Sequence, residues 1–410
     1  MISWPQIHQP YIEVKLKPLI LNDSKQGMVQ VRNSRFFSMY VCGITPYDAT
    51  HLGHAATYIA FDLINRYLKL EHTSVHFVEN ITDIDDPLFE RASRDSIDWK
   101  TLAQSQISLF TEDMCALKIL PPDDFVRVTD SINLVIEFIK MLQRKGYVYE
   151  ISGDFYFASS DFLSDLPIPQ AEAVEIFAQR GGDPTREGKA HPLDPILWLK
   201  NKDQEPGWES PFGFGRPGWH VECTAIALDY LDRNEEDYVI DLQGGGNDLL
   251  FPHHFMSAQL IKAATGRDFA KFYIHTGLVG YEGEKMSKSK GNLEFVSRLI
   301  KQGVDPVVIR WALIRDHYQS YREWNVGLLQ NSVSEVDLIR KALAKSEVCP
   351  VDELIEEIIS ALSNNLQTQV VTDLIIAWAR NSLAGDDSTS FKNDSGKLSR
   401  ALDSLLGLVF

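Results

Sequence analysis

The chain has 410 residues, of which 44% are hydrophobic and 24% are charged, and its formal net charge is −17. This length exceeds what one simple core fills, so we expect a soluble globular protein of two or three domains. The acidic balance counts against a nucleic-acid partner, because contacts to phosphates need a basic face.

The N-terminal residues and the cysteines bear on the compartment. The start, MISWPQIHQPYIEV, has neither the basic region nor the apolar run of a secretory signal. No apolar run approaches the roughly 20 residues that a membrane span needs. The scattered cysteines Cys42, Cys115, Cys223 and Cys349 are then expected to be thiols or metal ligands, not disulfides. We therefore expect a cytoplasmic protein with no membrane partner.

The first part of the chain alternates predicted strands and helices. Residues 36–42 (FFSMYVC) and 73–80 (TSVHFVEN) have the composition of strands, and residues 53–70 between them carry apolar residues at helical spacing. A β-α-β unit predicts a parallel sheet that binds ligands at the carboxyl ends of its strands.

The middle of the chain interrupts this alternation. We expect a helix over 131–146, a hairpin over 147–159 and a loop-rich segment with many Pro and Gly residues over 180–218. We interpret the region as an insertion between two halves of the sheet.

The α/β pattern then returns. Helices are expected over 220–231 and 253–266 and strands over 237–243 and 271–279, with GGGNDLLFPHH as a turn between. Beyond about residue 305 the patterns are helical throughout. The expected domains are the first half of the catalytic domain (1–125), an inserted subdomain (126–215), the second half (216–304) and a helical C-terminal domain (305–410).

Two short motifs suit ATP. His51-Leu-Gly-His54 stands between a predicted strand and helix, where free N–H groups and the helix dipole favour phosphate. A pair of capping or surface histidines is the ordinary explanation. The run KMSKSKGN places Lys285 and Lys288 in a Gly-bounded loop, where positive charge would assist the departure of pyrophosphate. A solvated charged loop is the ordinary explanation here.

Together these motifs resemble those of class I aminoacyl-tRNA synthetases, in order and spacing, over most of the chain. The resemblance implies a Rossmann-like (HUP-type) α/β fold, with an inserted subdomain and an α-helical C-terminal domain on a parallel sheet. It also implies that an amino acid is activated as its adenylate with Mg²⁺ and ATP. The implied catalytic residues are His51, His54, Lys285 and Lys288.

Two cysteines and a histidine suit zinc. Cys42 precedes HLGH, Cys223 lies in GRPGWHVEC and His253 opens the HH pair. Thiolates and imidazole are preferred zinc ligands, although a buried thiol or a capping histidine explains each residue alone. The set resembles that of cysteinyl-tRNA synthetases, in which such a zinc binds the thiolate of the substrate cysteine and so excludes serine. Cys115 and Cys349 match no motif and are expected to be buried thiols.

Several segments indicate a branch of that family. Ser257 stands where the synthetases have a glutamate as fourth zinc ligand. The segments GITPYDATHLGHAATY, DDPLFERA, GRPGWHVEC and QRGGDP resemble mycothiol ligases, which join cysteine to glucosaminyl-inositol. In QRGGDP, Arg180 and Asp183 are candidates for the acceptor loop. Gln179 and Phe255 depart from the pattern, because acidic residues are common at both positions.

The resemblance implies further roles by position. About one zinc ion per chain would be held by Cys42, Cys223 and His253. Trp219 would wall the cysteine pocket, although core packing is ordinary for such a residue. The residues implied to line the substrate and adenylate site are Cys42, Gly43, Ile44, Thr45, Thr57, Asn80, Ile81, Thr82, Trp219, Gly246, Asn247, Asp248 and Val279.

The expected reaction is ATP-dependent ligation of L-cysteine to the amine of glucosaminyl-inositol through cysteinyl-AMP, releasing AMP and diphosphate, as a step of mycothiol biosynthesis. The expected partners are these small molecules, with no nucleic acid, and the expected state is a monomer. A chain of 410 residues leaves no length for a usual anticodon-binding domain. Two alternatives stay open: a truncated cysteinyl-tRNA synthetase, and a non-catalytic paralogue that binds cysteine or adenylate.

Overall fold

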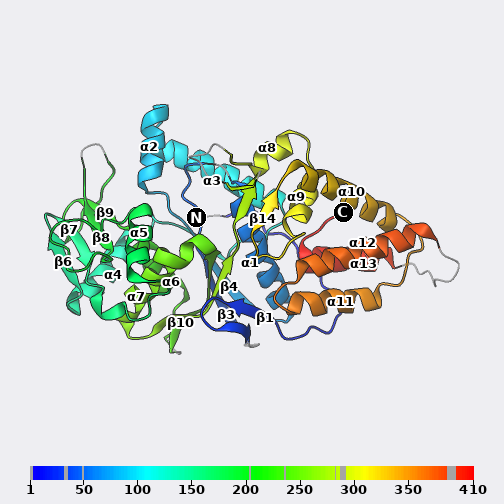
Figure 1. Ribbon diagram of the computed structural model, residues 1–410, viewed down its shortest axis with the longest axis horizontal. Helices are drawn as coiled ribbons and strands as arrows, with labels where there is room; N and C mark the ends of the chain where they lie inside the picture. The colour runs from blue at the N-terminus through cyan, green and yellow to red at the C-terminus, as the bar shows by residue number, and fades with distance from the viewer. Residues whose placement is uncertain are drawn as a thin grey trace.

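A five-stranded parallel sheet lies at the centre of the computed structural model (Figure 1). Its order is β11-β10-β3-β4-β5, and each neighbouring pair is parallel, as the β-α-β pattern predicts. The strands are β3 (Phe36–Val41), β4 (Ser74–Ile81), β5 (Asp124–Arg127), β10 (Tyr238–Gly246) and β11 (Asp268–Thr276). The structure describes residues 3–31, 36–48, 50–202, 205–234, 237–281, 283–286, 292–385 and 394–410.

Helix α1 (Leu52–Leu70) connects β3 to β4 and is buried along most of its length. Buried residues occur on all of its faces, because the sheet lies on one side and the C-terminal helices pack on another. The crossover brings the residues just after Val41 and the HLGH motif to the carboxyl edge of the sheet. Two further helices, α2 (Asp86–Asp95) and α3 (Trp99–Ala116), lead from β4 to β5.

A second, antiparallel sheet follows β5 along the chain. The expected hairpin is confirmed as β6 (Val148–Ile151) and β7 (Asp154–Phe157). Two strands in the segment expected to be loop extend it, β8 (Ile196–Lys200) and β9 (Gly215–Pro217). This part also contains α4 (Ile132–Arg144), the short η1 (Ser160–Phe162) and α5 (Gln170–Gln179).

The second half of the central sheet departs from expectation at the glycines of GGGNDLLFPHH. These glycines are not in a turn but in β10, because its partner β11 continues the hydrogen-bonded ladder to Thr276. A Cβ on Gly244 would lie 2.3 Å from the ring of Phe61 in α1, so glycine permits the close packing of helix and strand. The elements here are α6 (Trp219–Leu231), η2 (Asn247–Leu249), η3 (Leu250–His254) and α7 (Phe255–Thr265).

The C-terminal part is helical, as predicted, apart from one short strand. Strand β14 (Arg322–Trp324) pairs in parallel with β12 (Val279–Tyr281), which also pairs with β13 (Glu284–Lys285). Three residues are too few to show the alternation of a strand, so no local pattern indicated this strand. The helices are α8 (Val296–Lys301), α9 (Pro306–Leu313), α10 (Val326–Leu343), α11 (Asp352–Ser363), α12 (Thr368–Ala384) and α13 (Ser395–Leu406).

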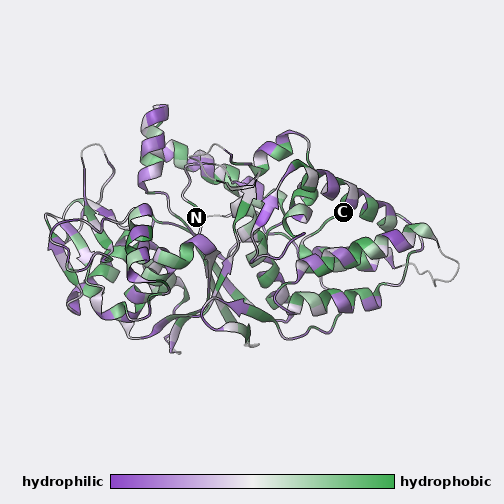
Figure 2. Cartoon of the chain, in the orientation of Figure 1, coloured by the Kyte–Doolittle hydropathy of each residue, from purple (hydrophilic) through white to green (hydrophobic). Residues whose placement is uncertain are grey.

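Figure 1 shows helices α10–α13 at one end of the molecule and the β6–β9 sheet at the other, with the central sheet between them. Polar and apolar residues share each of these helices (Figure 2), and their apolar side chains join the same core cluster as α1. The hairpin of β1 (Ile20–Asp23) and β2 (Gly27–Gln30) lies beside β11. No described helix has both the length and the apolar character to cross a membrane.

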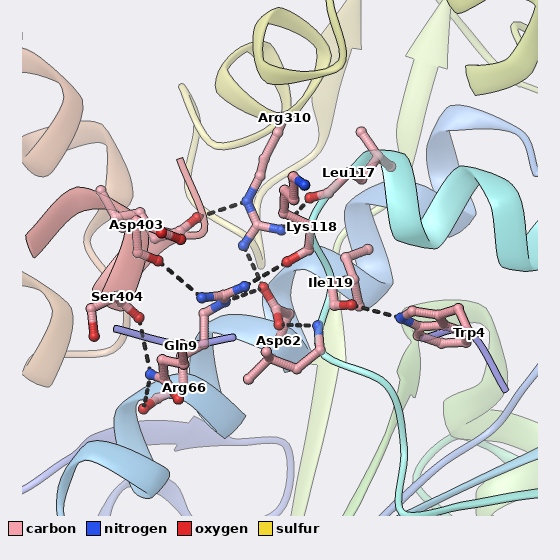
Figure 3. A network of polar contacts seen from close by, with 12 residues as sticks. Trp4, Gln9, Asp62, Arg66, Leu117, Lys118, Ile119, Arg310, Asp403 and Ser404 are labelled. Atoms are coloured by element: carbon pink, nitrogen blue, oxygen red, sulfur yellow. Dashed lines mark hydrogen bonds and ion pairs between the residues drawn. The ribbon is translucent and has the colours of Figure 1, made fainter. Parts of the chain in front are cut away.

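A buried ion cluster ties α1 to the C-terminal helices (Figure 3). Asp62 forms ion pairs with Arg66 of the same helix, at 2.8 Å, and with Arg310 of α9. All three side chains are at most 1% exposed. The guanidinium groups also donate to the backbone carbonyls of Leu117, Lys118, Asp403 and Leu406. The cluster therefore joins four chain segments, α1, the residues after α3, α9 and α13, through charges that are out of water.

Candidate active site

The HLGH motif begins α1 at the carboxyl edge of the sheet. His51 is the N-cap of the helix, and its Nδ1 accepts hydrogen bonds from the N–H groups of Gly53 (3.1 Å) and His54 (3.4 Å). The capping explanation of this histidine is therefore correct. Because Nδ1 accepts, a neutral His51 carries its ring proton on Nε2. The two imidazoles stack with centroids 3.7 Å apart.

His54 is a neutral group in this site. Burial lowers the pKa of His54 to about 4, so at neutral pH its imidazole carries no charge. It can donate one hydrogen bond to a phosphate but contributes no positive charge. A Cβ on Gly53 would lie 2.8 Å from the His51 ring, so glycine at this position keeps the cap compact.

Both histidines line a cavity of about 390 Å³ at the end of the sheet. Walls come from the loop after β3, from the start of α1 and from the ends of β10 and β11. Of the residues predicted for the site, those that line this cavity are Cys42, Gly43, Ile44, Thr45, His51, His54, Thr57, Arg180, Trp219, Gly246, Asp248 and Val279.

Other predicted residues lie behind this wall. Asn80 accepts the N–H of Gly43 through Oδ1 at 3.1 Å, and the N–H of Thr82 donates to the Ile44 carbonyl at 3.0 Å. These contacts hold the β3 loop against the end of β4. Ile81 is buried at that strand end. Asn247 follows the lining residue Gly246 but does not itself line the cavity.

Gly43 offers a direct test of this wall. A Cβ at this position would lie 1.5 Å from the carbonyl oxygen of Asn80, so Gly43→Ala must displace the backbone that lines the cavity. We expect cysteine-dependent exchange of pyrophosphate into ATP to fall by about tenfold or more, which is a loss of at least about 1.4 kcal/mol. Gly396→Ala in α13 is the control, because its nearest neighbour atom is 3.7 Å away. Unchanged exchange in Gly43→Ala would contradict this account.

The KMSKS segment starts at the rim of the same cavity. Met286 lines it, and the backbone of Lys285 pairs with Gly280 in the β12–β13 hairpin. The side chain of Lys285 and the whole of Lys288 lie outside the described residues. Their proposed phosphate contacts therefore remain proposals.

Three residues from separate elements lie close together beside the cavity, and one of them, Cys42, also lines it. The ligand atoms of Cys42, Cys223 and His253 all lie within 4.8 Å of one another, and the three residues are buried. The Nε2 atom of His253 has no hydrogen-bond partner among the described residues, although it is shielded from water. A buried imidazole nitrogen without a partner beside two thiols is a donor set that fits zinc.

The surroundings of His253 fix the orientation of its ring. Its Nδ1 lies 3.0 Å from Nδ1 of His220, and Trp219 stacks on it with centroids 4.2 Å apart. Ser257 donates its hydroxyl to the His253 carbonyl at 2.8 Å, so this residue is engaged with the backbone of its own helix. Three protein ligands leave one position of a tetrahedral site open to a substrate.

The two thiols differ in their readiness to ionise. Interaction with the Cys42 thiol, and then the nearby His253, holds the pKa of Cys223 well below its ordinary value despite burial. The hydrogen bond to Cys223 and burial raise the pKa of Cys42 well above its ordinary value. Cys223 is therefore the thiol that ionises first. Of the remaining cysteines, Cys349 is buried as expected, whereas Cys115 is only half-buried because it lies near the end of α3.

A chain of histidines behind Cys42 was missed by the sequence interpretation. The Sγ atom of Cys42 lies 3.3 Å from Nε2 of His254, whose Nδ1 lies 2.8 Å from Nε2 of His275. Nδ1 of His275 in turn lies 2.7 Å from the Ser24 hydroxyl, in the turn between β1 and β2. The HH pair was the single sequence signal for this chain, because His275 and Ser24 come from distant segments.

The acceptor-loop candidates follow α5. Arg180 donates to the backbone carbonyl of Asp248 at 2.8 Å and so ties the loop to the end of β10. Asp183 forms an ion pair with Lys189 at 2.9 Å. Of the two departures from the family pattern, Gln179 lies directly before Arg180 and bonds to an exposed glutamate on α5, whereas Phe255 packs in a small apolar cluster.

Comparison with known proteins identifies the family. Residues 28–334 match the model described as the tRNA synthetases class I (C) catalytic domain. The chain is 45% identical to L-cysteine:1D-myo-inositol 2-amino-2-deoxy-alpha-D-glucopyranoside ligase of Gordonia bronchialis, with all of both chains covered. It is 44% identical, again over both full lengths, to the protein of that name from Streptomyces coelicolor. The chain belongs to the mycothiol ligase family. It is a carbon–nitrogen ligase.

A solved structure shows the same fold. Mycobacterium tuberculosis methionyl-tRNA synthetase in complex with methionyl-adenylate aligns with a TM-score of 0.65 and 16% identity, over 91% of this chain and 90% of that chain. This confirms the class I synthetase-like fold predicted from HLGH and KMSKS. The same fold thus occurs in the mycothiol ligase family and in a tRNA synthetase.

Proposed function

We propose that the protein ligates L-cysteine to the amine of glucosaminyl-inositol with ATP, through a cysteinyl-AMP intermediate. One observation carries this proposal: Cys42 belongs both to the thiol–imidazole cluster and to the wall of the cavity that His51 and His54 line. This shared residue supports the proposal, because an amino-acid side chain bound at the cluster would lie next to a nucleotide bound in the cavity. The names of the full-length relatives supply the acceptor.

The reaction has two balanced steps. First, the carboxylate of cysteine attacks the α-phosphorus of ATP, and the bond to pyrophosphate breaks. The ring proton on Nε2 of His51 is the donor that we assign to the nucleotide, and Thr45 and Thr57 line the cavity beside it. Next, the amine attacks the activated carbonyl carbon, a C–N bond forms, the C–O bond to AMP breaks and the nitrogen loses a proton.

Two metal ions belong to this proposal. Cys42, Cys223 and His253 would hold zinc, which would supply a soft Lewis acid that favours a thiol substrate over serine. Mg²⁺ accompanies ATP, as is typical of the synthetase family. We further propose that the protein is a cytoplasmic monomer and that it binds no nucleic acid. The net charge of −17 supports the second point, because contacts to phosphates need basic residues.

Assay of the acceptor tests the function. The protein is incubated with ATP and cysteine, plus either glucosaminyl-inositol or total tRNA, and AMP release is measured alongside mass spectrometry of the product. We expect AMP release and an amide product with glucosaminyl-inositol and none with tRNA. Release with tRNA alone would refute the proposal. Absence of cysteine-dependent pyrophosphate exchange would refute the adenylate intermediate and favour a non-catalytic binder.

A further inference from the structure

A second cavity, of about 920 Å³, opens beside the first. The two cavities share the residues Thr45, Tyr47, Arg180 and Trp219. The other walls of the second cavity come from the start of α2, from the loop after α5 and from strands β8 and β9. Its volume lies within the range of small-molecule sites, and its position lets a molecule inside it reach a group activated in the first cavity.

Most of the charged side chains that line this cavity are already paired with one another or with a close neighbour. Their charges therefore compensate one another. A ligand in the cavity can form hydrogen bonds with these side chains but meets little net charge from them. Lys200 forms no ion pair with any described residue. The pairs are Asp86–Arg216, Asp154–Arg186, Asp183–Lys189, Arg180–Asp248 and Lys202–Glu205.

Asp85 differs from these carboxylates. It is half-buried at the N-cap of α2, where Oδ1 accepts the N–H of Asp86 at 2.9 Å, and it forms no ion pair with any described residue. Oδ2 lies 3.5 Å from the hydroxyl of Thr45, a residue of the wall between the cavities. Burial raises the pKa of Asp85 to about 6, and the opposing effect of the Arg216 guanidinium, which is paired with Asp86, does not cancel it. Glu90 likewise forms no ion pair within the described part of the chain, but it is exposed.

We propose that the second cavity is the acceptor site, and that Asp85 binds the amino group of the acceptor. This inference rests on the proposed function, because it requires an acceptor that carries an amine. A half-buried carboxylate that forms no ion pair with any described residue can accept an ammonium group, and hydroxyl groups can bond to the paired charges around it. The contact holds the nitrogen beside Thr45, within reach of the activated carboxyl in the first cavity.

Asp85→Asn tests the proposal, because asparagine has the same shape and also caps helices. We expect cysteine-dependent pyrophosphate exchange to stay within about twofold of the wild type. The KM for glucosaminyl-inositol should rise by about tenfold to 100-fold, as for the loss of a hydrogen bond to a charged group. Glu90→Gln removes the same charge from the same cavity and should leave both values unchanged. Asp85→Ser, which also retains a cap, is a second variant should Asp85→Asn fold poorly.

The possible outcomes separate this inference from the proposed function. If the wild type forms the amide and Asp85→Asn has an unchanged KM for the acceptor, the inference is wrong and the function stands. An equal rise in Glu90→Gln, or a loss of exchange in Asp85→Asn, would also overturn the role of Asp85 as an acceptor contact. If the wild type forms no amide with glucosaminyl-inositol but retains exchange, the proposed acceptor is wrong and the inference falls with it.

Discussion

Cys223→Ser should lose zinc and, with it, the activation of cysteine. The wild type is expected to hold about one zinc per chain, and the variant less than about a fifth of that. Serine does not supply the soft thiolate that zinc prefers, and the remaining Cys42 and His253 are too few to retain the ion. Cysteine-dependent pyrophosphate exchange should fall by more than about 100-fold, because second-shell changes alone cost up to that much.

Metal analysis after gentle purification, without chelators, measures the first effect, and exchange with cysteine or serine measures the second. Cys115→Ser is the matched control, since this half-buried thiol on α3 does not belong to the cluster. It should retain both zinc and exchange. A wild type without zinc, or a Cys223→Ser variant that keeps zinc and exchange, would show that the cluster does not select the substrate through a metal.

Asp62→Asn should be the most destabilising of these substitutions. It removes the carboxylate that forms ion pairs with both Arg66 and Arg310, and both guanidinium groups are out of water (Figure 3). Breaking a buried ion pair by removal of one partner costs about 3–5 kcal/mol, because an uncompensated charge stays behind. Urea unfolding followed by circular dichroism measures the loss. Asp337→Asn, which breaks the exposed pair with Lys341 on α10, should change the midpoint little.

The same carboxylate sets the direction of a pH effect. Burial alone would raise the pKa of Asp62, but Arg66 and Arg310 lower it below its ordinary value. A group whose pKa is lower in the folded protein stabilises the fold above its unfolded pKa of about 3.9. That contribution is lost as the pH falls through the folded pKa. The difference in stability between wild type and Asp62→Asn should therefore shrink in acid, and a difference that grows would contradict this assignment.

Local patterns predicted much of the fold. Strands β3 and β4 and helix α1 were expected because each carries its periodicity in a continuous stretch, and α1 also has its cap in the HLGH motif. Shorter elements escaped prediction. Strand β5 has four residues and β9 has three, and both depend on hydrogen bonds to partners that are distant in the chain. Such pairings have no local signature, because the partner strand supplies their stability.

The sequence by itself determined which chemical groups are present: two thiols and an imidazole of the kinds that zinc binds, and two motifs that suit ATP. The tertiary structure alone decided that Cys42, Cys223 and His253 lie within 4.8 Å of one another. It also decided that Asp85 forms no ion pair with a described residue, whereas its neighbour Asp86 is paired with Arg216. The physical reason is that a parallel sheet collects the carboxyl ends of distant strands at one edge, so the neighbours of a residue there are set by topology and not by sequence distance.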